Sequence, residues 1–247
     1  MSRETSLDGG TERRGQSAVV GVALLLGLTM LSLGVLTASV GTIVQSNAAT
    51  ADAGRVTADF ESTLEPVEAT GPGRGTVSFT DGTLRRVDRS VRVLNDSGVV
   101  ATESVGGLVY ENAEHRVAFL SGGVVRGTGE GARFATEPPV VASDDVLVIG
   151  VARLNASGPD AVSGSETSVT LRTDVSHSRR TLGNDSYRVA VETATPAAWE
   201  SYFRRANATT SRRDFDGDGV DSVVADFGED RTTYLVVHDL RVEVNGG

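Results

Sequence analysis

The stretch RRGQSAVVG at residues 13–21 opens an apolar run that continues to Val44 and decides the fold of the N-terminal part. No charged side chain occurs between Arg14 and Asp52, and Ala18–Val44 consists only of Ala, Val, Leu, Ile, Met, Gly, Ser and Thr. As a helix this run would be about 40 Å long, more than the roughly 30 Å hydrocarbon core of a bilayer. Because lipid offers backbone groups no hydrogen-bond partner, the run predicts one tilted transmembrane helix.

The charges on either side of the run predict its direction across the membrane. Arg3, Arg13 and Arg14 precede it, and the acidic bulk of the chain follows it. By the positive-inside rule, residues 1–15 stay cytoplasmic and the C-terminal domain is extracellular. An ordinary secretory signal has a shorter apolar region of about 7–15 residues. We therefore expect a single-pass protein of the cell membrane.

Three glycines in the run recur at a spacing of seven: Gly27, Gly34 and Gly41. This spacing is nearly two helical turns, so the three lie on one stripe of the helix. Small residues on one face let helix backbones approach closely in a membrane, which favours a helix-packing role. The alternative is that glycine is simply common in transmembrane helices.

The start of the run resembles that of archaeal type IV pilin-like proteins, especially those of halophilic archaea. Their class III, or prepilin-type, signal peptides end in a basic residue plus Gly or Ala, followed by a pattern like Val-Ser-Pro-Val-Ile-Gly and a long apolar helix. Ser17, Val19 and Gly21 match that pattern. Ala18 stands where Pro is usual, and Val20 stands where many pilins elsewhere carry Glu at the fifth mature position.

The resemblance implies a processing site formed by Arg13, Arg14, Gly15 and Gln16, at which a prepilin peptidase cuts after Gly15. It also implies partnership with other pilin-like subunits through the N-terminal helix. The departures from the pattern leave open a major pilin, a minor pilin or a pilin-like surface protein. The motif covers about 30 residues and says nothing about the domain that follows.

The amino-acid composition indicates which partners and which environment suit that domain. The chain has 33 acidic and 23 basic residues, a net charge of -10, and every basic residue is Arg. This charge argues against nucleic acid and against an anionic bilayer surface as partners, and it suits solubility at high salt. With no Cys there are no disulfides, so an extracellular domain must depend on a hydrophobic core.

The apolar run becomes amphipathic after Gln45, with one helical face marked by Val56, Phe60, Leu64 and Val67. Pro66 should end the helix, so we predict one helix over Ala18–Glu65, whose outer half packs on a globular head. The Gly-rich segment Ala69–Gly75 is expected to be a linker or broad turn.

Alternating apolar residues and frequent turn signals predict strands from Thr76 onward. Asp81-Gly82 is typical of a hairpin turn between Thr76–Thr80 and Leu84–Leu94. Further strands are expected at Val99–Val105, Gly107–Tyr110, Arg116–Leu120, Ala132–Ala135, Val146–Leu154, Ser168–Val175, Tyr187–Glu192 and Thr233–Val244. The predicted fold class is α+β: a long N-terminal transmembrane and stalk helix, then a mainly antiparallel β head with one short helix. The expected domains are a leader at 1–15, a helix at 16–67 and a head at 68–247.

The short helix is predicted at Thr195–Phe203, where Thr195 suits the N-cap and Pro196 the first helical position. Trp199, Tyr202 and Phe203 share one face of that helix. Such an aromatic group can bind sugars, but the single Trp of a domain is more often part of its core. We therefore expect this helix to pack on the sheet.

An acidic loop follows, with Asp214, Asp216 and Asp218 at positions 1, 3 and 5 of a calcium-loop pattern and Gly219 at position 6. Alternate carboxylates of this kind converge on one Ca²⁺ ion. Position 12 is Ala225 instead of the bidentate Glu, although Asp221 adds a carboxylate nearby. A Ca²⁺ site and an acidic turn both remain open.

Four glycosylation sequons begin at predicted turns or element ends: Asn95, Asn155, Asn184 and Asn207. Glycosylation needs exposed loops on a translocated domain, which is where these are expected.

Catalytic motifs are not found, and we expect the protein not to be an enzyme. The three histidines are scattered, and no nucleophile elbow or phosphate loop occurs. Two functions remain: a structural or minor subunit of a type IV pilus-like surface filament, or a singly anchored extracellular binding protein that does not polymerise.

Overall fold

The structure is a computed structural model that describes residues 12–64, 69–113 and 115–246, with the backbone alone at 12–19, 40–43 and 45. Helix α1 spans Glu12–Leu64, which confirms the long N-terminal helix and places its beginning before the predicted Ala18. The predicted end at Glu65 and the apolar position Val67 lie outside the described residues. The chain divides into two compact units, residues 1–47 and 48–247, so the last turns of α1 belong with the β domain.

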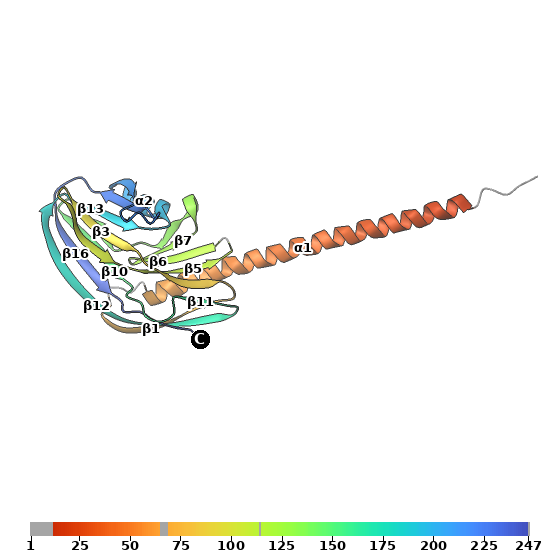
Figure 1. The fold of residues 1–247 in the computed structure, drawn as a ribbon, viewed down its shortest axis with the longest axis horizontal. Helices are drawn as coiled ribbons and strands as arrows, with labels where there is room; N and C mark the ends of the chain where they lie inside the picture. Colours follow the sequence, from red (N-terminus) through yellow and green to blue (C-terminus); the bar gives the residue numbers. More distant parts are fainter. Residues whose placement is uncertain (1–11, 65–68, 114, 247) are drawn as a thin grey trace, which may run out of the picture. The chain divides into compact units, whose positions relative to one another are not determined.

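The described strands of the β domain form three sheets, almost wholly antiparallel (Figure 1). The first sheet contains β1 (Gly71–Phe79), β9 (Val140–Ala142), β10 (Val146–Arg153), β12 (Thr167–Asp185), β16 (Arg231–Asp239) and β17 (Glu243–Gly246). The second contains β2 (Thr83–Val87), β5 (Gly107–Asn112), β6 (His115–Leu120), β7 (Gly123–Arg126), β8 (Arg133–Thr136) and β11 (Ala161–Ser163). The third contains β3 (Ser90–Asn95), β4 (Gly98–Ser104), β13 (Arg188–Glu192), β14 (Thr209–Arg213) and β15 (Ser222–Asp226). Outside the sheets, α2 spans Pro196–Arg205 and a 3-10 turn spans Gly129–Gly131.

The longest strand, β12, organises the first sheet. Its first half pairs with β1 on one side and with β17 on the other, and its second half pairs with β16. The β16 strand in turn pairs with β10 in parallel, an exception to the antiparallel pattern. Figure 1 shows β12 beside β1 and β16.

The first hydrophobic core surrounds the end of α1. Val56, Phe60 and Leu64 are fully buried there, as the helical periodicity predicts. They pack with β1 and β12 of the first sheet and with β2, β5 and β6 of the second. The segment of α1 from Ala53 to Leu64 therefore lies between two sheets as part of the core.

The second core lies between the β10 and β16 side of the first sheet and the third sheet, and it includes α2. Trp199 and Phe203 are fully buried, which confirms the core assignment of the aromatic face. Thr195 and Pro196 stand at the N-cap and first-turn positions as predicted, but the Thr195 side chain makes no capping bond and contacts Thr193 Oγ1 instead.

The predicted linker and hairpin after α1 are wrong. The Gly-rich segment from Gly71 is the first half of β1, and β1 pairs with β12 instead of β2. A Cβ at Gly75 would lie 1.9 Å from Thr63 Oγ1, so glycine here lets the strand pass close to α1. The turn at Asp81-Gly82 carries the chain from the first sheet to the second, and the Asp81 N–H bonds to Asp52 of α1.

Two predicted long strands are interrupted, and five short strands were not predicted. Leu84–Leu94 breaks at Asp88-Arg89 into β2 and β3, which belong to different sheets, and Thr233–Val244 breaks into β16 and β17. The unpredicted strands are β7, β9, β11, β14 and β15. Short or polar segments such as Thr209–Arg213 carry no apolar alternation, so only pairing with neighbours identifies them.

Candidate functional site: an apolar helix and the polar sites of the β domain

The first candidate site is the apolar part of α1. Val20–Ser39 is long and apolar enough to cross a membrane, and none of it is buried within the protein. Such a helix near the N-terminus can serve as a membrane anchor or as a signal sequence. Its hydroxyl groups are compatible with lipid because they bond to the helix itself: Thr29 to Leu26 O, Ser32 to Leu28 O and Thr37 to Leu33 O.

The glycine stripe lies on this part of the helix. A Cβ placed on Gly27 or Gly34 would meet nothing within 4 Å, so no neighbour among the residues that the structure describes requires glycine there. The backbone is helical at Gly41 and at the processing residues Arg13, Arg14, Gly15 and Gln16. The structure does not describe the side chains of these residues.

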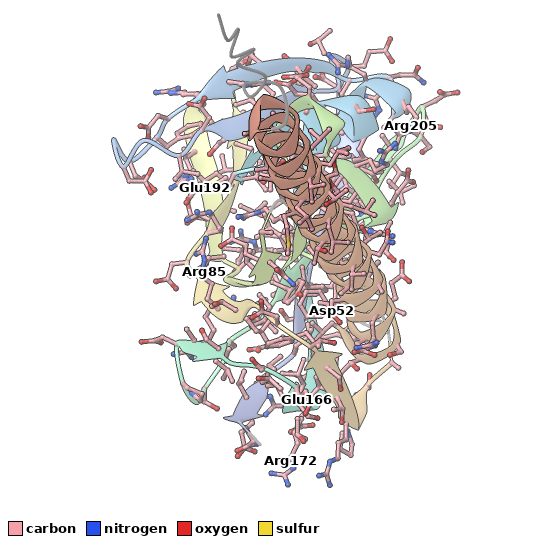
Figure 2. The ribbon with its side chains drawn as sticks, turned by 90° about the vertical axis from the view of Figure 1, so that its right-hand side faces the viewer. Asp52, Arg85, Glu166, Arg172, Glu192 and Arg205 are labelled. Atoms are coloured by element: carbon pink, nitrogen blue, oxygen red, sulfur yellow. The ribbon has the colours of Figure 1, made fainter. Side chains whose placement is uncertain are left out.

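Three carboxylates on the last turns of α1 hold the helix to the β domain. Asp52 accepts the N–H of Thr80 at 3.0 Å, and Asp59 accepts the N–H of Ser78 at 3.0 Å. Glu61 accepts the hydroxyl of Thr136 at 3.1 Å. Burial raises the pKa of Asp59 above its ordinary value, although the Ser78 N–H partly opposes this shift. Figure 2 shows Asp52 on the helix beside the strands.

The acidic loop joins β14 to β15 and is closed by its own carboxylates. Asp214 accepts the N–H groups of Asp216 at 3.1 Å, Gly217 at 2.7 Å and Gly219 at 3.1 Å. These bonds lower the pKa of Asp214, the Gly217 bond most. Asp218 accepts the N–H of Val220 at 2.9 Å. The geometry is that of a hydrogen-bonded turn.

Asp216 points instead to Arg92 on β3, whose Nη2 lies 2.5 Å away, and Asp221 is exposed. Among the residues that the structure describes, no group of three or more His, Asp or Glu side chains is gathered to hold a metal. The calcium hypothesis for this loop therefore stays a prediction, and the structure lends it no geometric support.

A buried ion-pair network lies beside the loop, and no motif in the sequence indicates it. Arg92 and Glu192 are both buried, with Arg92 Nη1 3.7 Å from Glu192 Oε2 and Arg89 Nη1 3.5 Å from Glu192 Oε1. The pKa of Glu192 is raised, chiefly by burial and also by Asp218 and Asp216, although Arg89 and Arg92 oppose the shift. Phe215 lies under both Arg92 and Arg213, at 5.0 and 4.6 Å from its ring centroid, which fastens the loop to β3. Glu192 is labelled in Figure 2.

The four sequon asparagines lie at or near element ends. Asn95 ends β3, Asn184 is the second-last residue of β12, and Asn155 and Asn207 follow β10 and α2. Asn155, Asn184 and Asn207 are exposed. The Nδ2 of Asn95 donates to Asp185 at 2.9 Å, so a glycan there would displace a side-chain hydrogen bond.

A polar cleft of about 670 Å³ opens where the ends of β4 and β10 meet the β2–β3 corner. Four of its charged side chains are paired, Arg86 with Asp160 and Arg153 with Glu103, and Asp88 also lines the cleft. Arg86 Nη1 also donates to the carbonyl of Ala156 at 2.5 Å. The residues are far apart in sequence, so the spacing of motifs could not have revealed the cleft.

The described part of the chain thus contains one candidate membrane span followed by a mainly antiparallel β domain. The chain belongs to the Family of unknown function (DUF7289), whose profile matches residues 14–243. The match begins at Arg14, so the family includes the apolar helix as well as the β domain. No curated protein and no solved structure gives a significant match to the chain.

Proposed function

We propose that this protein is a structural or minor subunit of a type IV pilus-like surface filament of an archaeal, halophile-type cell. The observation that carries the proposal is that the motif at residues 13–21 leads into the apolar span Val20–Ser39 of α1, none of which is buried within the described part of the chain. A prepilin peptidase would cut after Gly15, and the helix would hold the subunit first in the cell membrane and then among other pilin-like helices. The β domain would lie outside the cell.

The glycine stripe supports assembly through the helix. Apart from the adjacent backbone of the helix itself, no atom of the described residues lies within 4 Å of a Cβ placed on Gly27 or Gly34. Glycine weakens a helix by about 1 kcal/mol relative to alanine, so a regular stripe of it calls for a compensating contact outside the chain. Close packing against a neighbouring helix supplies one.

The second candidate function is a singly anchored extracellular binding protein that keeps its helix in the membrane. The polar cleft of about 670 Å³ favours it, because this volume lies in the range typical of small-molecule sites. The two functions share the anchor and the orientation, and differ in whether the helix enters a filament.

The substitution Gly34→Leu distinguishes the two functions. In a lone anchor the stripe faces lipid, and Leu is among the most favourable residues at a helix centre. In a filament the larger side chain would force neighbouring backbones apart. We expect Gly34→Leu to be made, processed and inserted normally but to be missing from sheared surface filaments.

Ser32→Leu is the matched control. Ser32 lies about 160° around the helix axis from the stripe at 100° per residue, and its hydroxyl bonds only to its own helix. This variant should enter filaments like the parent. Equal incorporation of Gly34→Leu would show that the stripe is not an assembly face, and a parent chain absent from filaments would favour the anchored binding protein.

A further inference from the structure

Two of the three histidines meet across the first sheet. His177 on β12 and His238 on β16 are directly opposed in the antiparallel ladder, although 61 residues separate them in sequence. Their Nδ1 atoms are 3.0 Å apart, and the rings stand edge to face with centroids 5.0 Å apart. His238 is buried and His177 is exposed, so the pair has one protected and one open side.

Without a metal, this contact is a hydrogen bond in which one Nδ1–H donates to the other Nδ1. The same distance also fits two ligands of one metal ion. Imidazole nitrogens bind at about 2.0–2.1 Å, which places two of them about 2.9 Å apart at a right angle and about 3.4 Å apart at the tetrahedral angle. The observed 3.0 Å is close to the right-angled value.

We propose that His177 and His238 form a two-histidine site for a divalent transition metal ion with right-angled coordination. Among first-row ions Cu²⁺ binds nitrogen ligands most strongly and prefers tetragonal N,O geometry. The hydrogen of the donating Nδ1 moves to Nε2 when the metal binds, so both Nδ1 lone pairs face the ion and each ring stays neutral.

The sheet supplies the rigidity that such a site needs. Both residues lie within a ladder in which Ser176–Thr181 pair in register with Tyr234–Asp239, so the nitrogen atoms are held by two paired strands. No third His, Asp or Glu completes a metal-holding group within the described ranges. Water therefore takes the remaining coordination positions, on the open side at His177.

Titration of the full-length chain with CuCl₂ in an uncharged detergent tests the proposal. We expect the melting temperature to rise with Cu²⁺ and the electron paramagnetic resonance spectrum to show hyperfine coupling to two imidazole nitrogens. His177→Gln should weaken Cu²⁺ binding about tenfold or more and leave coupling to one nitrogen.

His115→Gln is the matched control, since His115 lies near Thr50 and has no second imidazole beside it. This variant should bind Cu²⁺ like the parent. The exposed His177 is the decisive position because replacing the buried His238 risks the fold. Unchanged affinity and spectrum in His177→Gln, or an equal loss in His115→Gln, would assign the copper to other groups and overturn the proposal.

Discussion

The carboxylate of Asp52 accepts the backbone N–H of Thr80 at 3.0 Å, which ties α1 to the end of β1 across 28 residues of sequence. The same carboxylate accepts the Thr80 hydroxyl at 3.0 Å, the N–H of Asp81 at 3.3 Å and Nη1 of Arg55 at 3.1 Å. Asp52 is 1% exposed, so water can replace few of these bonds. One helix residue therefore closes the turn that leads from the first sheet to the second.

Asp52→Ala should destabilise the β domain substantially. The substitution removes the buried carboxylate that accepts the N–H groups of Thr80 and Asp81, and bonds to a charged group are worth about 1.5–3 kcal/mol each. We expect the free energy of unfolding to fall by about 3 kcal/mol, measured by urea unfolding of the full chain in detergent. Asp144→Ala, at an exposed acidic position, should change it by less than about 0.5 kcal/mol. Equal stability of the two variants would contradict this role of Asp52.

Gly15→Leu should block removal of the leader. The basic residues and glycine before the apolar run resemble a prepilin peptidase site, and a large side chain at the cut would not fit a site built for glycine. Intact-mass measurement of the membrane form should give a mature chain beginning at Gln16 for the parent and residues 1–15 still attached for the variant. A parent chain that keeps its leader in cells with an active peptidase would refute the processing site.

Glu192 should make stability depend on pH. Its pKa is raised from the ordinary 4.5, chiefly by burial, so the folded state holds this proton more tightly than the unfolded state. Its contribution is complete below pH 4.5 and is lost as the pH rises through the raised pKa. The stability of the parent relative to Glu192→Gln should therefore decrease as the pH rises from about 4 to 7. A difference that is constant or increases over that range would contradict the shift.

The sequence pattern and the turn geometry make opposite predictions for calcium at the acidic loop. Ligand bound only to the native state would raise the melting temperature, as the positions of Asp214, Asp216 and Asp218 suggest. Because Asp214 already accepts three N–H groups and Asp216 pairs with Arg92, we expect no change with millimolar CaCl₂ at fixed ionic strength. A rise that Asp214→Asn abolishes would instead support the calcium loop.

The helices were predictable because their signals are local. The period of Val56, Phe60 and Leu64 marks the buried face of α1, and Pro196 with the aromatic residues after it marks α2. Each pattern repeats within a few turns of one element, so tertiary packing only reinforces it.

Sheet partners were not predictable in the same way. Asp81-Gly82 favours a hairpin locally, but the end of α1 fills the space between β1 and β2 and sends them to different sheets. The pairing of the acidic loop was not predictable for a related reason, because its partner Arg92 comes from β3, 124 residues away along the chain. Likewise, only the register of β12 against β16 reveals that His177 meets His238.

The path of β12 has a mechanical consequence. Val169 and Leu171 near its beginning belong to the core around α1, whereas its second half pairs with β16, whose Leu235 and Val237 belong to the other core. Unfolding of either core would remove backbone hydrogen-bond partners from strands that belong to the other core. We therefore expect the β domain to unfold in a single transition. A pulling force applied through α1 would then have to unfold the whole β domain in one step.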